Sequence, residues 1–228
     1  MRLRLVTALF VGLSAAACTA DFHQAADAGD VATVRQLLAA GQAIDGRDGL
    51  DMTALHRAAR SCQPAVTGFL IEQGAAIDLV TRFAASALYL AVANECLEVS
   101  RLLLDAGADV GLAGATGITP LEISAGDGRL PIARMLIERG ASVDSRNIAG
   151  WTPLMVAAHR GHPAVLQLLL HSGADSDLTD ELGQDAYHHA TQTTYFLRED
   201  ARQSLQPPAD NAAVVKLLDA ARRAGVAL

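Results

Sequence analysis

Aromatic and basic residues are scarce in this chain of 228 residues. Aromatic side chains make up 4% of it, with one Trp, although 51% of the residues are apolar. This composition favours thin layers of short, closely packed helices over one large globular core. The 18 Lys and Arg residues are outnumbered by 25 Asp and Glu residues, and they form no run. Because nucleic acid and anionic membranes require clustered positive charge, neither is expected as a partner.

The short motifs that carry catalysis are also missing. The sequence contains no G-x-S-x-G, H-E-x-x-H, P-loop or G-x-G-x-x-G pattern, so it offers no recognisable nucleophile turn, zinc site or phosphate loop. We therefore expect a chain that is not an enzyme and that has no catalytic residue, cofactor or metal. One enzymatic alternative stays open, namely a cryptic site in an irregular segment near the C-terminus.

What the sequence does have is a period of 33 residues. Apolar residues recur at this spacing as Phe22, Leu55, Leu88, Leu121, Leu154 and Tyr187, and glycine recurs as Gly41, Gly74, Gly107, Gly140 and Gly173. A fixed period of this length indicates a stack of one structural unit. The concave surface of such a stack usually binds a partner, so the pattern indicates a binding module.

Each unit is predicted to be a pair of helices followed by a loop. An Ala-rich segment such as T-P-L-M-V-A-A (152–158) forms the first helix, and Thr119 and Thr152 are placed to cap the helices that they precede. A second apolar helix ends at the periodic glycine, which adopts a left-handed backbone without steric cost. Strings such as D-S-R-N-I-A-G (144–150) then predict a hairpin-like loop.

These strings and their period resemble the ankyrin repeat over about residues 21–225. The resemblance implies an all-α solenoid of about six helix-turn-helix units with hairpin-like loops. The repeat domain would occupy residues 21–228, with units at about 21–47, 48–80, 81–113, 114–146, 147–179 and 180–228. The last unit carries an insertion near 193–210, which is either a C-terminal cap or a docking appendage.

The T-P-L-H motif of this family is only partly kept. Its histidine is present at His56, with His23 and His188 at matching places in weaker motifs. In the other three units Tyr89, Glu122 and Met155 take its place. The hydrogen bond between Thr and His that the family implies is therefore not expected in those units.

The first 20 residues predict a secretory signal. Arg2 and Arg4 precede an apolar run over residues 5–13, which is followed by small residues and is too short for a comfortable membrane span. Cleavage after Ala17 or Ala20 would give an exported, periplasmic protein. Without residues 1–17 the chain has 16 basic and 25 acidic residues and a formal charge of −9.

Cys18 raises a second version of this prediction. The string S-A-A-A-C resembles a bacterial lipobox, in which Cys18 would become the lipidated first residue. Ala15 stands where the lipobox prefers Leu, and a lipid on Cys18 would hold the first repeat against the bilayer. Soluble and lipid-anchored forms therefore both stay open, and a lipid on Cys18 is the one membrane contact expected.

Cys62 and Cys96 are the other two cysteines of the chain. They occupy neighbouring places in the interhelix turns of adjacent units, and an oxidising compartment would permit a disulfide between them. The resemblance implies layers about 10 Å apart, which is the packing distance of helices, whereas a disulfide requires Cα atoms within roughly 7 Å. A bridge and a pair of free thiols both stay open.

The resemblance also implies a partner-binding groove, formed by the loop tips and the exposed side of each first helix. The matching positions are Met52, Arg60, Ser61, Phe83, Asn94, Ile118, Asp127, Trp151, His159, Arg160, Leu182 and Gln184. Ile118, Trp151 and Phe83 are expected to form an apolar stripe beside Arg60 and Arg160, because aromatic residues and Arg are the usual anchors of an interface. Alternatively, Trp151 only packs against the next loop.

Together these features predict a non-enzymatic protein-interaction module of a bacterial envelope, acting as a monomer. The small exported ankyrin-repeat proteins that it resembles include partners of a periplasmic catalase and lipidated immunity partners of secreted toxins. A secreted effector that acts inside host cells is a further alternative, although a cleavable signal with two Arg argues against it. The sequence does not name the partner protein.

Overall fold

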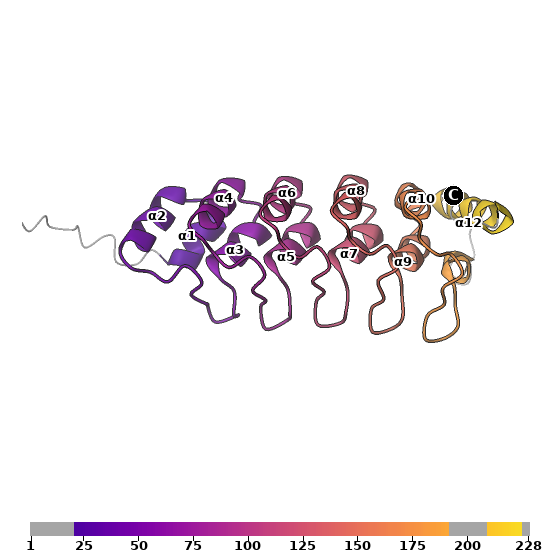
Figure 1. The fold of residues 1–228 in the computed structure, drawn as a ribbon, viewed down its shortest axis with the longest axis horizontal. Coiled ribbons are helices and arrows are strands. Elements are labelled where there is room, and N and C mark those ends of the chain that lie inside the picture. The colour runs from indigo at the N-terminus through magenta and orange to yellow at the C-terminus, as the bar shows by residue number, and fades with distance from the viewer. Residues whose placement is uncertain (1–20, 192–208, 225–228) are drawn as a thin grey trace, which may run out of the picture.

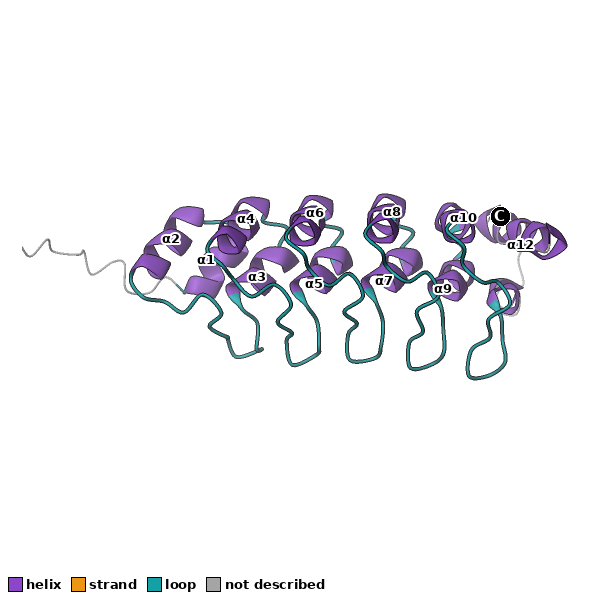
Figure 2. Cartoon of the chain, viewed as in Figure 1, coloured by secondary structure: helices purple, strands orange, loops and turns teal. Residues whose placement is uncertain are grey.

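The computed structural model describes residues 21–191 and 209–224, and in this part of the chain pairs of helices alternate with loops (Figure 2). Residues 186–191 begin a sixth unit with a further helical segment. The first helices of the five complete pairs are α1 (Phe22–Ala28), α3 (Ala54–Arg60), α5 (Ala87–Ala93), α7 (Pro120–Gly126) and α9 (Pro153–Arg160). The second helices are α2 (Val31–Ala39), α4 (Pro64–Glu72), α6 (Leu97–Asp105), α8 (Leu130–Glu138) and α10 (Pro163–His171), and the final helix is α12 (Ala209–Ala224).

The helices form two parallel rows along the long axis of the molecule (Figure 1). The first helices make one row, in which α1 packs on α3, α3 on α5, α5 on α7 and α7 on α9. The second helices and α12 make the other row, and the loops project together at one edge. Because each pair contacts its sequence neighbours, the architecture is the predicted all-α solenoid.

Capping residues fix where the first helices begin. The side chains of Asp21, Thr53, Ser86, Thr119 and Thr152 each accept a hydrogen bond from a backbone amide of the following turn. The predicted caps at Thr119 and Thr152 are confirmed, and each is followed by a proline at the first helical position, where no hydrogen bond is lost.

The periodic leucines form the core. Leu55, Leu88, Leu121 and Leu154 of the first helices are at most 1% exposed, and the second helices of four pairs also contribute wholly buried leucines, namely Leu70, Leu103, Leu136, Leu166 and Leu169. Burying one such side chain contributes about 1.5–3 kcal/mol to folding. Wholly buried alanines such as Ala58 and Ala91 let neighbouring first helices approach closely, so each interface depends on both repeats.

The loops are hairpin-like and share one backbone hydrogen bond. In each loop, the amide of its first residue donates to the carbonyl four positions later, in the pairs Asp48–Met52, Thr81–Ala85, Gly114–Ile118, Asn147–Trp151 and Asp180–Gln184. The bonds repeat every 33 residues with lengths of 2.9–3.1 Å. Equivalent loop residues therefore lie in equivalent positions along the edge of the array.

Two predicted segments fall outside this description. The signal at residues 1–20, with Cys18, lies outside the described residues, as does the insertion at 193–210 except for its last two residues, which open α12. Within residues 21–191 and 209–224, no helix has the length and apolar character that crossing a bilayer requires.

Candidate functional site

A polar side chain at the first position shapes four of the five loops. The Asp48 carboxylate accepts hydrogen bonds from the amides of Leu50 (2.7 Å) and Met52 (3.0 Å). Thr81, Asn147 and Asp180 accept the corresponding pair of amides in their own loops. Such side-chain bonds to the backbone two residues on are the mechanism by which Asp and Asn stabilise turns. They fix the third loop residue at the tip and the fifth at the base.

Large apolar side chains gather at the loop tips. The exposed large hydrophobic residues among the described residues are Leu50 (42% exposed), Phe83 (66%), Leu97 (45%), Ile148 (74%) and Leu182 (79%). Leu50, Phe83 and Leu182 are the third residues of their loops, Ile148 is the second residue of its loop, and Leu97 lies on α6. We call Leu50, Phe83, Ile148 and Leu182 the loop-tip row. Exposed apolar residues scattered singly need no explanation, but four along one edge of the array make that edge a candidate contact surface.

Hydrogen bonds between loops hold this row in place. The amides of Ala115, Ile148 and Glu181 donate to carbonyls of the preceding loop at 3.1–3.3 Å. Arg82 adds a hydrogen bond from its guanidinium to the Gly49 carbonyl. The loops therefore form a ladder along the array, and their tips are preorganised rather than independent.

A hollow of about 330 Å³ adjoins the loop-tip row between the second and third repeats. Leu50, Met52 and Phe83 line it from the loops, and Arg60 and Tyr89 line it from α3 and α5. Met52 is 5% exposed, so it belongs to the wall of the hollow rather than to the open surface. The hollow has the size and lining to receive an apolar side chain with a polar group beside it.

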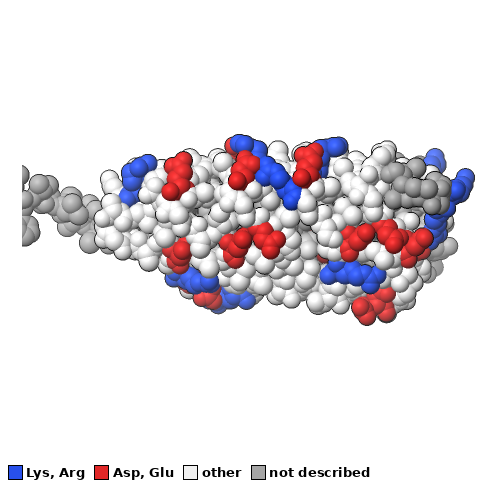
Figure 3. All heavy atoms as spheres, viewed as in Figure 1, with Lys and Arg blue, Asp and Glu red and all other residues white. Residues whose placement is uncertain are grey.

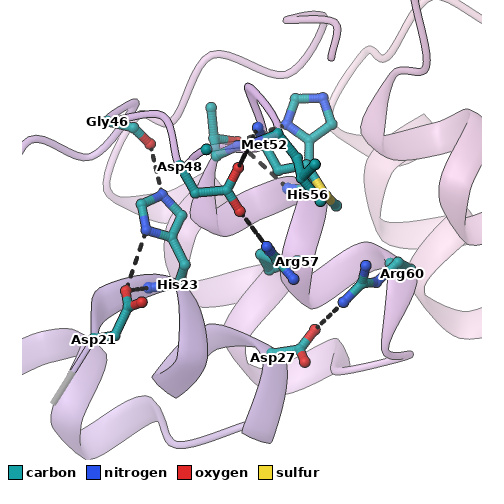
Figure 4. Close-up of polar contacts among 12 residues, drawn as sticks. Asp21, His23, Asp27, Gly46, Asp48, Met52, His56, Arg57 and Arg60 are labelled. Carbon is teal, nitrogen blue, oxygen red and sulfur yellow. Dashed lines mark hydrogen bonds and ion pairs between the residues drawn. The ribbon is translucent and has the colours of Figure 1, made fainter. Parts of the chain in front are cut away.

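Two ion pairs join α3 to its own loop and to the preceding repeat (Figure 4). The Arg57 guanidinium contacts the Asp48 carboxylate, and Arg60 lies 3.2 Å from Asp27. Burial alone would raise the pKa of Asp48, but the hydrogen bonds from Arg57 and from the loop amides outweigh it and lower the pKa to about 2. Asp48 is thus a permanent anion that locks its loop to α3.

An aromatic and histidine cluster occupies the equivalent place in the fifth and sixth repeats. The Trp151 ring lies 5.2 Å from that of His159 and 4.2 Å from that of His189, measured between ring centroids. The Nε2 atom of His189 lies 3.0 Å from the Asp180 carboxylate, and both side chains are almost wholly buried. Burial lowers the pKa of both histidines, so the neutral rings that pack on Trp151 are favoured.

Glu122 is a buried carboxyl in the middle of the array. It is 4% exposed, and its Oε1 atom accepts a hydrogen bond from Asn147 of the next loop at 2.5 Å. Its Oε2 atom has no hydrogen-bond partner among the described residues. Burial raises the pKa of Glu122 to about 7, and the hydrogen bonds from the Asn147 side chain and the Thr119 backbone only partly offset this.

Charged residues of both signs are interspersed on the face shown in Figure 3. On the second helices, Arg101 pairs with Glu98 (2.6 Å) and Asp105 (3.3 Å), and Arg139 reaches Asp105 from the next repeat (2.5 Å). Acidic groups run across the middle of this face, and no extended basic area appears on it. This face does not offer the charge pattern that nucleic acid requires.

Comparison with protein families now identifies the architecture. A family model described as ankyrin repeats in three copies matches residues 22–114 and 113–180. The chain belongs to the ankyrin-repeat family. Among solved structures, it is similar to an ankyrin repeat domain from Acinetobacter baumannii, with 29% sequence identity and a TM-score of 0.76 over 88% of this chain and 97% of that one. A search of curated proteins found no match.

The predicted groove residues of this ankyrin array fall into two lines on either side of the first helices. Met52, Phe83, Ile118, Trp151, Leu182 and Gln184 lie in the loops, whereas Arg60, Ser61, Asn94, Asp127, His159 and Arg160 lie at the C-terminal ends of the first helices or just beyond them. Phe83 belongs to the exposed tips, and Ile118 and Trp151 are half-buried at the loop bases.

The C-terminal line is tied down by local contacts. Arg60 and the Ser61 hydroxyl both bond to Asp27 of the preceding repeat, and Asp127 pairs with Arg129 at 2.8 Å. Asn94 donates to the Leu90 carbonyl at 2.8 Å.

Leu50 and Ile148 are surface residues that sequence reasoning missed. The sequence prediction rests on the loop position of Trp151, which the hairpin bond places at the base of the loop rather than at its tip. The signal that could have found them is an apolar residue in the middle of a turn-forming string, as in D-G-L-D (48–51) and N-I-A-G (147–150). Buried residues do not occupy such positions.

Ankyrin repeats indicate a protein–protein interaction module, and this is the function that the family supports. Three or more His, Cys, Asp or Glu side chains do not converge into a metal-holding group anywhere in the described ranges. The structure does join Cys62 and Cys96 in a disulfide, with Cα atoms 5.1 Å apart.

Proposed function

We propose that the chain is a non-catalytic binding module whose protein partner contacts the loop-tip row and the concave side of the first helices. The observation that carries this proposal is the collection of Leu50, Phe83, Ile148 and Leu182 along one edge, next to a hollow lined by Leu50 and Phe83. Apolar side chains that are exposed to water add nothing to the stability of the fold, so a partner that covers them is the simplest reason for their presence.

The rigidity of the loops supports the same surface. Hydrogen bonds within and between loops order the backbone before any partner arrives. A preorganised surface loses little conformational entropy on binding, so most of the contact energy is retained as affinity. Phe83 is the expected anchor, because it is the one aromatic member of the row and stands at the mouth of the hollow.

The test compares two positions of the loop-tip row with an exposed apolar control on α6. The partner is captured from the envelope fraction by crosslinking and its affinity is measured for wild type, Phe83→Ser, Ile148→Ser and Leu97→Ser. We expect each loop-tip variant to lose about 1–2 kcal/mol of binding free energy, and Leu97→Ser to bind like wild type, since Leu97 lies on α6 in the other row. Loss confined to Leu97→Ser would place the partner on the second helices.

The proposed location is the bacterial envelope. Its support is the sequence of residues 1–20, in which two Arg precede the apolar run over residues 5–13. Fractionation is expected to recover the wild type outside the cytoplasm and a variant lacking residues 1–20 inside it. If Cys18→Ser no longer associates with membranes, a lipid anchor is supported. If the variant fractionates in the same way as the wild type, a soluble form is supported. Export of the deletion variant would refute the signal.

A further inference from the structure

The disulfide occupies a contact position that recurs along the array. At three interhelix turns, a residue with a left-handed backbone faces the side chain found 34 positions later, in the next repeat. Gln63 packs on Gly29 and donates to the Asp27 carbonyl at 3.2 Å, and His162 packs on Gly128 and lies 2.9 Å from the Gly126 carbonyl. Cys96 meets Cys62 in this same register. A covalent bond therefore stands where neighbouring interfaces use a hydrogen bond.

The two sulfurs have unequal surroundings. Cys62 is exposed and sits in the turn with φ +54°, a conformation that favours glycine. Cys96 is 4% exposed and is the N-cap residue of α6, where no side chain accepts a hydrogen bond from the first-turn amides. An incoming thiolate consequently has access to the Cys62 sulfur and not to the Cys96 sulfur.

The same asymmetry defines a leaving group. When a thiolate attacks Cys62, the S–S bond breaks and Cys96 departs as a thiolate at the N-terminus of a nine-residue helix, where the helix dipole favours negative charge. The nearest carboxylates oppose this only weakly, because Glu95 and Glu98 are exposed and Glu98 is paired with Arg101. The Asn94 carbonyl oxygen lies 3.6 Å from each sulfur and can accept an S–H from either thiol once formed.

From this geometry we infer that Cys62–Cys96 is an exchange site for a dithiol reductant in the folded protein, with Cys62 as the attacked sulfur. One thiol of the reductant forms a mixed disulfide with Cys62 and releases Cys96. Its second thiol then displaces Cys62, so that two electrons and two protons pass to the chain and the reductant becomes a disulfide. Because the bond joins the turns that follow α3 and α5, reduction loosens the interface that also forms the hollow.

Native reduction is the first test. The oxidised full-length protein is treated with dithiothreitol without denaturant, and thiols are counted by mass spectrometry while circular dichroism reports folding. We expect complete reduction within minutes with the helical signal retained. Hydrogen exchange should then rise in α3 and α5 and stay unchanged in α7 and α9. Reduction only in denaturant, unchanged exchange, or two free thiols in the untreated exported protein would each overturn the inference.

A matched pair of variants tests which sulfur is attacked. In a Cys18→Ser background, Cys96→Ser leaves Cys62 as the one cysteine, and Cys62→Ser leaves Cys96. With 5,5′-dithiobis(2-nitrobenzoate), we expect Cys62 to react at least about tenfold faster than Cys96, because access limits the reaction of a buried thiol. Equal rates, or a faster Cys96, would show that the asymmetry does not exist in solution. Both variants keep one cysteine, so a general effect of the substitutions cancels.

Discussion

The second and sixth repeats both place a basic side chain against the first carboxylate of the loop, but the basic residues differ. In the second repeat Arg57 of the first helix contacts Asp48, nine residues earlier in the loop, and in the sixth His189 contacts Asp180 with the same separation. The pair in the second repeat keeps its charge over the physiological pH range, since the pKa of Asp48 is about 2. Burial lowers the pKa of His189, so the second cation is absent near neutrality.

The comparison shows that two repeats can share the geometry of a contact and still differ in how that contact depends on pH. Asp180 and Asp48 both organise their loops by accepting two backbone amides. The loop of the sixth repeat is additionally held by a residue that proton concentration can change. One end of the array is therefore fixed, whereas the other is able to respond to pH.

A charge buried in the middle of the array should cause the largest loss of stability. Leu121→Asp would place an unpaired charge in α7, between the repeats compared above, where the native side chain is wholly buried. We expect a loss of about 3–5 kcal/mol of stability, measured by denaturant unfolding. Leu97→Asp, at a 45% exposed position, is the control and should unfold like wild type. Equal stability of both variants would argue against the buried stack.

The buried Glu122 should make stability depend on pH in the direction opposite to the histidines of the sixth repeat. Its folded pKa, about 7, lies above the ordinary value of 4.5, so the folded state favours its proton and loses stability as pH rises from 4.5 through 7. Glu122→Gln keeps the acceptor for Asn147 and should be more stable than wild type at pH 8 by on the order of 3 kcal/mol. The gain should vanish near pH 4.5. Glu138→Gln, on the exposed side of α8, is the control for removal of a glutamate charge.

Trp151 reports on the titratable end directly, because it is the one Trp in the chain. The lowered pKa of His159 and His189 means that the folded state resists their protonation, so stability is lost as pH falls below the ordinary value of 6.5. We expect Trp151 fluorescence to decrease over this range, since a protonated imidazole quenches a stacked indole. His189→Gln should reduce the change. A pH-independent signal in wild type would mean that the histidines do not titrate beside the ring.

The smallest loss of stability is expected for the solvent-exposed ion pair between Arg60 and Asp27. Arg60 and Asp27 are each about one-third exposed, so their ion pair is screened by water. Arg60→Ala should cost less than about 1 kcal/mol of stability. Arg57→Ala, which leaves the largely buried Asp48 carboxylate without its main partner, should cost about 1.5–3 kcal/mol. Urea unfolding of the two variants would measure the difference, and a reversed order would contradict the contrast between rim and interior.

The sequence predicted the array well because the fold is a consequence of its period. Leu55, Leu88, Leu121 and Leu154 could be assigned to the core from spacing alone, and Thr119 and Thr152 could be assigned as caps from their place before a proline. These features depend on local chemistry that repeats without change.

Features that depend on the offset between repeats were harder to predict. A layer spacing of about 10 Å applies to equivalent positions, whereas Cys62 and Cys96 are staggered by one residue and their Cα atoms lie 5.1 Å apart. Met52 and Trp151 share a loop position, but the first is buried and the second packs on histidines of two repeats. Such differences arise from side chains of the neighbouring unit, which a motif does not contain.

The disulfide also limits how the array could lengthen by duplication. A copied 33-residue unit inserted after Gly107 or Gly140 would find the same interface on both sides and would extend the loop ladder by one rung. An insertion between Cys62 and Cys96 would separate two residues that must face each other in adjacent turns. We therefore expect a unit inserted between the second and third repeats to be tolerated less well than one inserted among the later repeats.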